Sequence, residues 1–200
     1  MHHENERLAQ DVAALSAMAE QMAEYLDSDV LFWPLGRGNL PMLTLGGYLL
    51  REHRLLALPQ LLTPEQRSQV DAAIFQFNQA LSDRVVRFET KAHHELESRL
   101  RQWEESVKEI EHGTLQHSSN YGTIVEPRAM IQALLDRLSM PPYRPDDRAG
   151  RLVTLLDTRL QNRWQPGEFV WPAEWQPAYP RDDFWWLYGS PRVAKYSGND

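Results

Sequence analysis

Four side chains with metal-binding or acid–base chemistry stand close together in the middle of the chain: Glu89, His93, His94 and Glu97. If this region is helical, Glu89, His93 and Glu97 are spaced four residues apart and share one face. Such a face could present three ligands to one metal ion, or supply a general acid and base. The simpler interpretation is a charged face turned to solvent. A helical-bundle enzyme would additionally require acids from another helix to converge on the same polar pocket.

Other sequence motifs give little support to catalysis. Glu109-x-x-His112 is one copy of a unit that di-iron bundles use twice, and the sequence contains no second copy. There are no cysteines, no Gly-x-Ser-x-Gly elbow and no Gly-Lys-Ser or Gly-Lys-Thr, which excludes thiol catalysis and P-loop chemistry. We therefore predict no catalytic residue, no cofactor and no metal, with Glu89, His93 and Glu97 as the remaining metal candidates.

The strongest helical pattern runs from Thr63 to Gly113. Thr63 suits an N-cap, Pro64 suits the first helical position, and Gln66 completes a capping box. Gly113 suits the position just after a helix, and no glycine or proline falls between Pro64 and Gly113. We predict a single helix of ~50 residues, about 70 Å long. A compact chain of this size has a radius of gyration of only ~16 Å, so such a helix would either overhang its domain or bend, and an overhang would meet a partner.

Apolar residues follow the predicted helix along its whole length, close to one per turn, from Val70 to Ile110. An exposed stripe of that size would cause aggregation, so another surface must cover it. The stripe therefore indicates either packing within a bundle or self-association.

A second apolar stripe lies in the predicted N-terminal helix, which extends from Glu4 to about Asp27. Its residues alternate between steps of four and three, which is the spacing of a coiled-coil seam. This stripe either packs within the chain or binds a second copy or another protein. Its members are Leu8, Val12, Leu15, Ala19, Met22 and Leu26.

Aromatic residues gather in two places that differ from the helical segments. The Phe32–Asn39 loop contains Trp33 and Arg37, and the C-terminal segment contains Trp185, Trp186 and Tyr188. Trp, Tyr and Arg dominate the energetics of protein interfaces, so both places are candidate interaction surfaces. The alternative is that these rings fill gaps at the ends of the bundle. Residues 165–200 alternate prolines with aromatic rings, which predicts an irregular strap packed across the helices, with a short helix or strand near Asp183–Tyr188 as an alternative for that part.

Composition and charge limit the classes of partner. The chain has 200 residues, 42% of them hydrophobic, and a net charge of −7. The longest apolar runs fall far short of the ~20 residues that span a bilayer, and the N-terminus lacks an apolar signal segment. We therefore expect a soluble, cytoplasmic protein without a membrane partner. The charge distribution does not form the basic stripe of a nucleic-acid-binding protein.

Together these observations predict an all-α fold, a helical bundle built around the ~50-residue helix. Residues 1–164 form the helical domain, and residues 165–200 form the strap. Shorter helices in this domain are predicted from Leu43 to Leu58, from Pro127 to about Ser139, and from an aspartate cap at Asp146 or Asp147 to about Trp164. The predicted function is non-enzymatic: a protein-interaction or structural protein that self-associates through its long amphipathic helices, making a homo-oligomer or binding another protein. The alternative is a helical-bundle enzyme with a site near Glu89–Glu97. A third hypothesis is a small-molecule or nucleic-acid binder that uses the tryptophan-rich tail.

Overall fold

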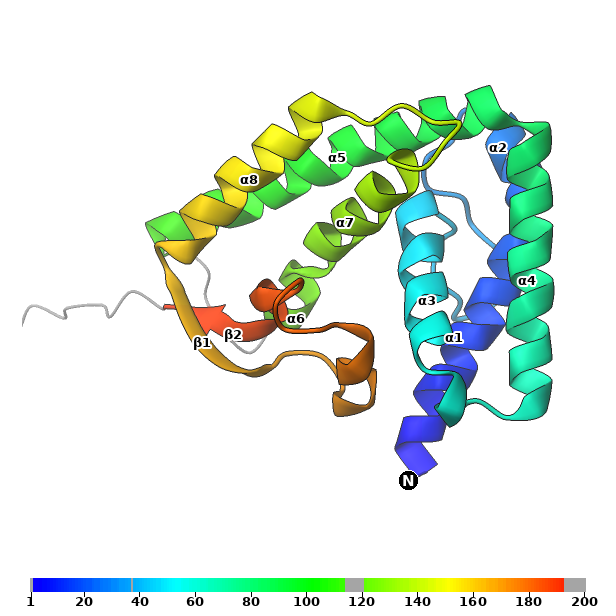
Figure 1. The fold of residues 1–200 in the computed structure, drawn as a ribbon, viewed down its shortest axis with the longest axis horizontal. Coiled ribbons are helices and arrows are strands. Elements are labelled where there is room, and N and C mark those ends of the chain that lie inside the picture. Colours follow the sequence, from blue (N-terminus) through cyan, green and yellow to red (C-terminus); the bar gives the residue numbers. More distant parts are fainter. Residues whose placement is uncertain (1, 37, 114–120, 193–200) are drawn as a thin grey trace, which may run out of the picture.

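The computed structural model describes residues 2–36, 38–113 and 121–192, and this part of the chain is mostly helical (Figure 1). A small antiparallel pair of strands lies near its C-terminal end. The helices and strands are α1 (His2–Glu20), α2 (Met22–Asp27), α3 (Leu45–Ala57), α4 (Pro64–Asp83), α5 (Val85–His112), α6 (Tyr121–Ile124), α7 (Glu126–Leu138), α8 (Asp147–Gln161), β1 (Trp164–Phe169) and β2 (Tyr188–Pro191), with short 3-10 turns at Pro59–Leu61, Ala173–Ala178 and Trp185–Leu187.

The prediction of one ~50-residue helix is wrong, because α4 ends at Asp83 and α5, with 28 residues, begins at Val85. Arg84 leaves helical geometry, with φ −137° and ψ 39°. Neither glycine nor proline causes this break. The segment from Ser82 to Val86 instead combines a serine and an aspartate, which compete for backbone hydrogen bonds, with two valines that lose side-chain freedom in a helix. Figure 1 shows α4 and α5 meeting at a sharp corner.

Tertiary contacts fix this corner against the end of α2. The guanidinium of Arg84 donates from Nε to Oδ2 of Asp27 at 3.0 Å, and Arg87 donates from Nη1 to the backbone carbonyl of Asp27 at 3.1 Å. The two outer ends of the predicted helix are confirmed. Thr63 and Gln66 form the capping box, and Gly113 adopts φ 70° as the left-handed cap of α5.

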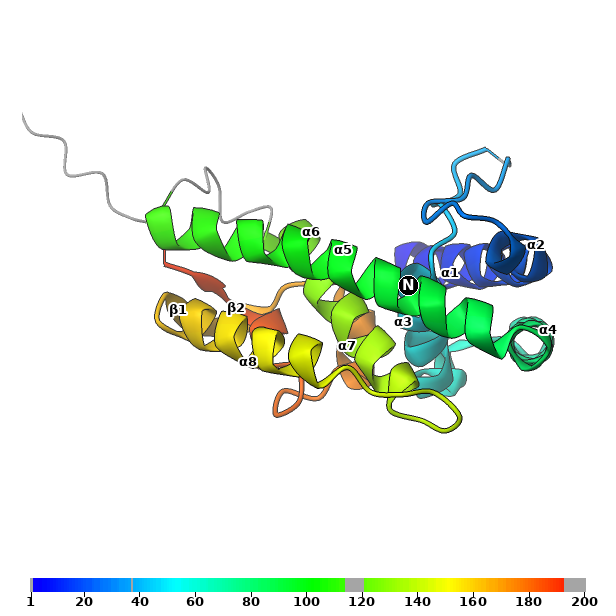
Figure 2. The ribbon, with the colours of Figure 1, turned by 90° about the horizontal axis from the view of Figure 1, so that it is seen from above.

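The corner directs the two halves of the apolar stripe to different neighbours. Helix α4 packs beside α1, and its Val70 and Phe77 are buried. Helix α5 packs against α7 and α8, and its Leu96 and Trp103 are fully buried. Figure 2 shows α5 extending across the molecule, with α8 beside it. The stripe is therefore covered by the chain itself, so the overhang that implied a partner is absent.

Helix α3 stands between the two halves, packing on α1 and on α7. Its predicted range, Leu43 to Leu58, is close to the observed Leu45–Ala57, and Thr44 caps it by accepting from the backbone N–H of Gly47. Helices were also predicted from Pro127 to about Ser139 and from Asp146 or Asp147 to about Trp164. They correspond to α7 and α8, and α8 ends three residues earlier than predicted.

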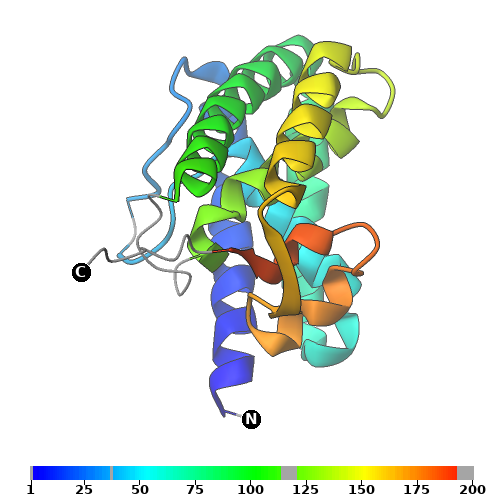
Figure 3. The same ribbon diagram turned by 90° about the vertical axis from the view of Figure 1, so that its left-hand side faces the viewer.

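The predicted strap is more regular than expected, because it contains most of β1 and all of β2. The strands pair antiparallel, with Trp164 opposite Pro191, and the register shifts between Pro166 and Phe169. Gly189 makes the pairing possible: at its φ of 146°, a Cβ atom would lie 2.2 Å from the carbonyl oxygen of Gln165. Figure 3 shows this segment below α8, on the side of the molecule where the 3-10 turn at Ala173–Ala178 approaches α3.

Candidate binding cleft

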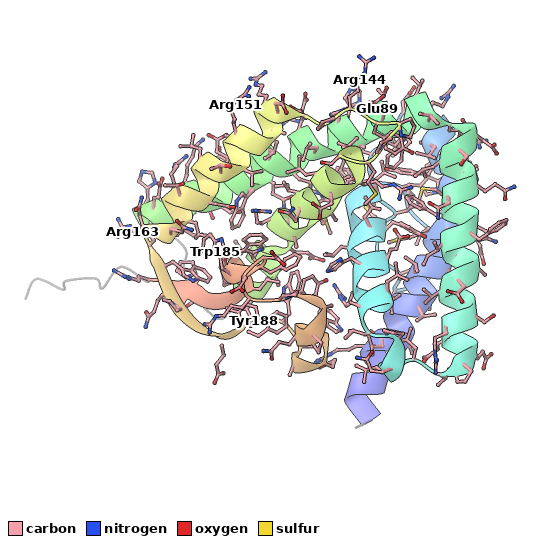
Figure 4. The ribbon with its side chains drawn as sticks, in the orientation of Figure 1. Glu89, Arg144, Arg151, Arg163, Trp185 and Tyr188 are labelled. Carbon is pink, nitrogen blue, oxygen red and sulfur yellow. The ribbon has the colours of Figure 1, made fainter. Side chains whose placement is uncertain are left out.

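The structure places Glu89, His93 and Glu97 along one face of α5, as predicted, but does not bring them to one point. Glu89 accepts a hydrogen bond from the backbone N–H of Arg144 at 2.8 Å, and these two residues lie together in Figure 4. His93 Nδ1 is 3.9 Å from Oδ2 of Asp146. Glu97 lines a separate hollow of about 340 Å³ with Asp146. These side chains hold the segment between α7 and α8 against α5.

The remaining histidine candidates are dispersed. His94 is exposed and lines a different hollow with Lys91, on another side of α5. His112 interacts through Nδ1 with the backbone carbonyl of Lys108 at 2.7 Å, within the last turn of α5. Among the residues that the structure describes, no group of three or more His, Cys, Asp or Glu side chains could hold a metal ion.

The N-terminal stripe lies in the hydrophobic core of this chain. Each of its four candidate interaction residues is at most 2% exposed: Leu8, Val12, Leu15 and Met22. Since α1 packs against α3 and α4, the seam-like spacing is accounted for by contacts within the chain.

Most of the aromatic candidates also make contacts within the chain. Trp33 is half-buried and donates from Nε1 to Oε1 of Gln21 at 2.8 Å, while Arg37 lies outside the described residues. Trp186 is 3% exposed and lies under the guanidinium of Arg128, whose Cζ is 3.8 Å from the ring centroid. Tyr188 donates from its hydroxyl to the carbonyl of Tyr179.

Trp185 and the neighbouring rings form an aromatic layer between the strap and the helices. Trp185 packs edge-to-face on Trp164, with ring centroids 5.4 Å apart, and Figure 4 shows Trp185 between the strand pair and the helices. Arg128 joins this layer to α8 through two hydrogen bonds to Asp157, at 2.9 and 2.8 Å. These residues therefore attach the strap to the helices.

A polar site lies where the strap meets α1 and α3. Two adjoining hollows, of about 680 and 370 Å³, share Asp11, Arg51 and Trp175 in their walls. We call them the first hollow and the second hollow, and together the strap cleft. The first is also lined by Arg7, Gln10, Ala13, Ala14, Asn39, Leu40, Pro41 and Pro172, and the second by Arg54, Gly122, Thr123, Glu126, Val170 and Trp171.

A buried ionic cluster stands between the two hollows. Arg54, which is 4% exposed, donates from Nη1 to Oδ2 of Asp11 at 2.6 Å and from Nε to the hydroxyl of Tyr179 at 3.3 Å. Its guanidinium also stacks on Trp175, with Cζ 3.4 Å from the ring centroid. One buried charge thus connects α1, α3 and the strap. Since breaking a buried ion pair leaves an uncompensated charge, this cluster fixes the walls of the cleft.

Arg51 is less well compensated than Arg54. Its Nε lies 3.4 Å from Oδ1 of Asp11 without forming a hydrogen bond, and its Nη1 donates to the carbonyl of Gly47 in its own helix. Burial lowers the pKa of Arg51, and the nearby charge of Arg54 lowers it further, although Asp11 and Glu126 oppose this shift. The cleft therefore contains a guanidinium whose charge is only partly balanced.

The cleft offers recognition chemistry rather than an assembled catalytic centre. Donors dominate its polar walls, apolar surface comes from Leu40, Pro41 and Trp175, and Asp11 is engaged by both arginines. Its other carboxylate, Glu126, forms no hydrogen bond with a nucleophile among the described residues. Aromatic rings and arginines around an open hollow are typical of binding surfaces.

Sequence reasoning missed this site because its residues come from distant parts of the chain. The two regions chosen for their aromatic residues do contribute: Asn39 belongs to the Phe32–Asn39 loop, and Trp175 belongs to the strap. The available signal was a pair of arginines, Arg51 and Arg54, within an otherwise leucine-rich helix. A charge in a helix that is largely buried needs a partner, and this requirement points to Asp11 only once the fold is known.

No protein family matches the chain, and no similar curated protein or solved structure was found. None of the helices in the described ranges combines the length and apolar character that crossing a membrane requires.

Proposed function

We propose that this chain is a non-enzymatic protein-interaction protein, and that the strap cleft receives a segment of its partner. The observation that carries the proposal is the pair of adjoining hollows, held in place by the buried Asp11–Arg54 pair and bordered by Trp175. Rigid walls favour binding because little side-chain freedom is lost when a partner arrives.

The first hollow has the features that an extended peptide segment requires. Leu40, Pro41 and Pro172 provide apolar contact surface, and the amide groups of Gln10 and Asn39 can pair with a peptide backbone. At about 680 Å³, the hollow is within the range of pockets that accept drug-sized molecules, a size comparable to a few amino-acid residues.

The proposed interaction surface is the strap cleft and no longer the apolar stripes of the helices. Self-association was predicted from the length of the overhanging helix and from the seam-like spacing of the N-terminal stripe, and both apolar stripes pack in the hydrophobic core of this chain. A second copy remains one candidate partner, and it would have to use the cleft. The enzyme alternative lacks a comparable observation, since Glu89 and His93 contact the segment before α8 rather than a shared pocket.

Blocking the cleft tests this proposal. Ala13 is exposed on α1 and lines the first hollow, so Ala13→Trp fills the hollow without entering the core. Thr154→Trp adds the same bulk on the exposed face of α8 and serves as the matched control. A displayed library of random ten-residue peptides is selected on the wild type, and binding of the enriched peptides is measured by fluorescence polarisation.

We expect enriched peptides to bind the wild type and Thr154→Trp equally, and to bind Ala13→Trp at least tenfold more weakly. A dimer in light scattering that Ala13→Trp dissociates would support the cleft with a second copy as the partner. Absence of enrichment without such a dimer, or peptides that bind Ala13→Trp as tightly as the wild type, would overturn the proposal.

A further inference from the structure

We propose that the occupant of the strap cleft places a carboxylate against Arg51, an inference that rests on the proposed function. The single carboxylate of Asp11 contacts two guanidiniums. It lies 2.6 Å from the guanidinium of Arg54 and 3.4 Å from that of Arg51, so Arg54 has the shorter contact. Carboxylates are the natural second partner of a guanidinium, because the planar fork of donors matches their two oxygens.

Two unpaired polar atoms lie beside the cleft, and they have the same hydrogen-bonding character. Nε of Arg51 and Nε1 of Trp175 are buried, and neither has a hydrogen-bond partner within the described part of the chain. Both atoms are donors, and an unpaired buried donor is energetically costly. An acceptor matches the polarity of this part of the cleft, and a carboxylate is an acceptor whereas an ammonium group is not.

The charges around Arg51 indicate from which side the carboxylate arrives. The second hollow contains Glu126, a half-buried carboxylate that would repel it. Of the described residues that line the first hollow, Asp11 is the sole acidic one, and both Arg54 and Arg51 already contact it. Arg7 also lines the first hollow, although its Nη1 is paired with Glu174 at 3.2 Å. The carboxylate therefore approaches through the first hollow, with neighbouring apolar atoms against Leu40 and Pro41.

The carboxylate can come from an aspartate or glutamate side chain or from the C-terminus of the partner. Peptides selected on the wild type are synthesised in three forms: unchanged, with each acidic residue changed to its amide, and with an amidated C-terminus. The form that loses affinity identifies the source. Each is titrated by fluorescence polarisation against the wild type, Arg51→Gln and the control Arg151→Gln, a change on the exposed face of α8 that Figure 4 shows far from the strap.

We expect removal of one carboxylate to weaken binding to the wild type and Arg51→Gln by different factors: about tenfold for the wild type and less than twofold for Arg51→Gln. Arg151→Gln should behave as the wild type does. If the carboxylate matters equally in the wild type and Arg51→Gln, this inference is overturned. The proposed function would nevertheless stand in that case, provided Ala13→Trp still abolishes binding.

A second variant keeps the test independent of the ionic cluster. Glu126→Gln removes the repelling charge and leaves Asp11, Arg51 and Arg54 in place. The acidic peptide should then bind about twofold to threefold more tightly and the amide form without change, because only the charged form is repelled. Equal effects on both forms, or none, would contradict a carboxylate at Arg51 even if Arg51→Gln failed to fold.

Discussion

Two faces of α5 carry polar side chains at the same spacing, yet they differ in burial. On one face, Glu89, His93 and Glu97 point toward the segment between α7 and α8 and keep partial contact with solvent. On another, Lys91 and Glu95 are 6% and 0% exposed; Lys91 binds the segment between α2 and α3, and Glu95 binds the first turn of α3. Figures 2 and 3 show that segment on one side of α5 and α8 on the other.

The buried face makes the stronger contacts. Lys91 donates from Nζ to the backbone carbonyls of Ser28 and Val30, at 2.7 and 2.8 Å. Glu95 accepts from the backbone N–H of Gly46 at 3.2 Å, next to the Arg99 guanidinium. Polar residues that are spaced along one face of a long helix can thus bind a neighbouring segment of the chain, as they do on both faces of α5. How much stability it contributes depends on how far water is excluded, because exposed ion pairs contribute little.

The largest expected effect comes from Lys91→Met on the buried face. This change leaves the carbonyls of Ser28 and Val30 without their donor, and we expect a loss of about 2–3 kcal/mol in the free energy of unfolding. Urea denaturation measures the loss. Lys108→Met on the same helix is the matched control, because Lys108 contacts Glu104 and Glu105 on the exposed surface and its replacement should change stability far less. Equal losses of stability in Lys91→Met and Lys108→Met would contradict the claim that the buried contacts of α5 are stronger than the exposed ones.

The stability of the folded chain should depend on pH through the ionisation of Glu95. Burial raises the pKa of Glu95, while Arg99 and the Gly46 N–H lower it. The folded state therefore binds this proton more tightly than the unfolded state, where a glutamate has a pKa of about 4.3. Its contribution to stability is fully present below that pH and is lost as the pH rises through the raised folded-state pKa. A tenfold difference in proton affinity between the two states corresponds to about 1.4 kcal/mol.

Glu95→Gln does not titrate, so it should gain stability relative to the wild type as the pH rises from about 4 to 7. Thermal unfolding at several pH values measures this difference. Glu97→Gln makes the same change at an exposed position of α5 and serves as the matched control. A flat difference for Glu95→Gln would contradict a carboxylate that is harder to ionise in the folded chain.

The smallest expected effect comes from Glu89→Gln, on the face of α5 that carries the predicted metal candidates. Glu89→Gln retains an acceptor for the N–H of Arg144 and loses only the charge, so we expect a cost of about 0.5 kcal/mol. Urea denaturation beside Lys91→Met gives the ranking directly. A larger loss for Glu89→Gln than for Lys91→Met would show that the two faces have been ranked in the wrong order.

Local signals predicted the parts of the fold that depend on neighbouring residues. The capping box at Thr63, the glycine cap at Gly113 and the aspartate cap of α8 were readable because each uses residues within a few positions. The break at Arg84 was missed because its local signal is modest and contacts to Asp27, 57 residues away, stabilise it. Tertiary contacts override helix propensity at such a position.

The cleft was less predictable than the fold, for a related reason. The histidines of α5 attracted attention because their spacing is visible along one helix. Asp11, Arg54 and Trp175 belong to three separate segments, and no periodicity relates them. Their association becomes evident only when the distances between the segments are known.

The position of Trp175 in the chain has a consequence for biosynthesis. Asp11 and Arg54 precede Trp175, whose ring stacks on Arg54, by more than 100 residues. A nascent chain that ends before the strap therefore has Asp11 and Arg54 but not the indole ring that stacks on Arg54, so this buried guanidinium gains its aromatic neighbour only after the strap has been synthesised.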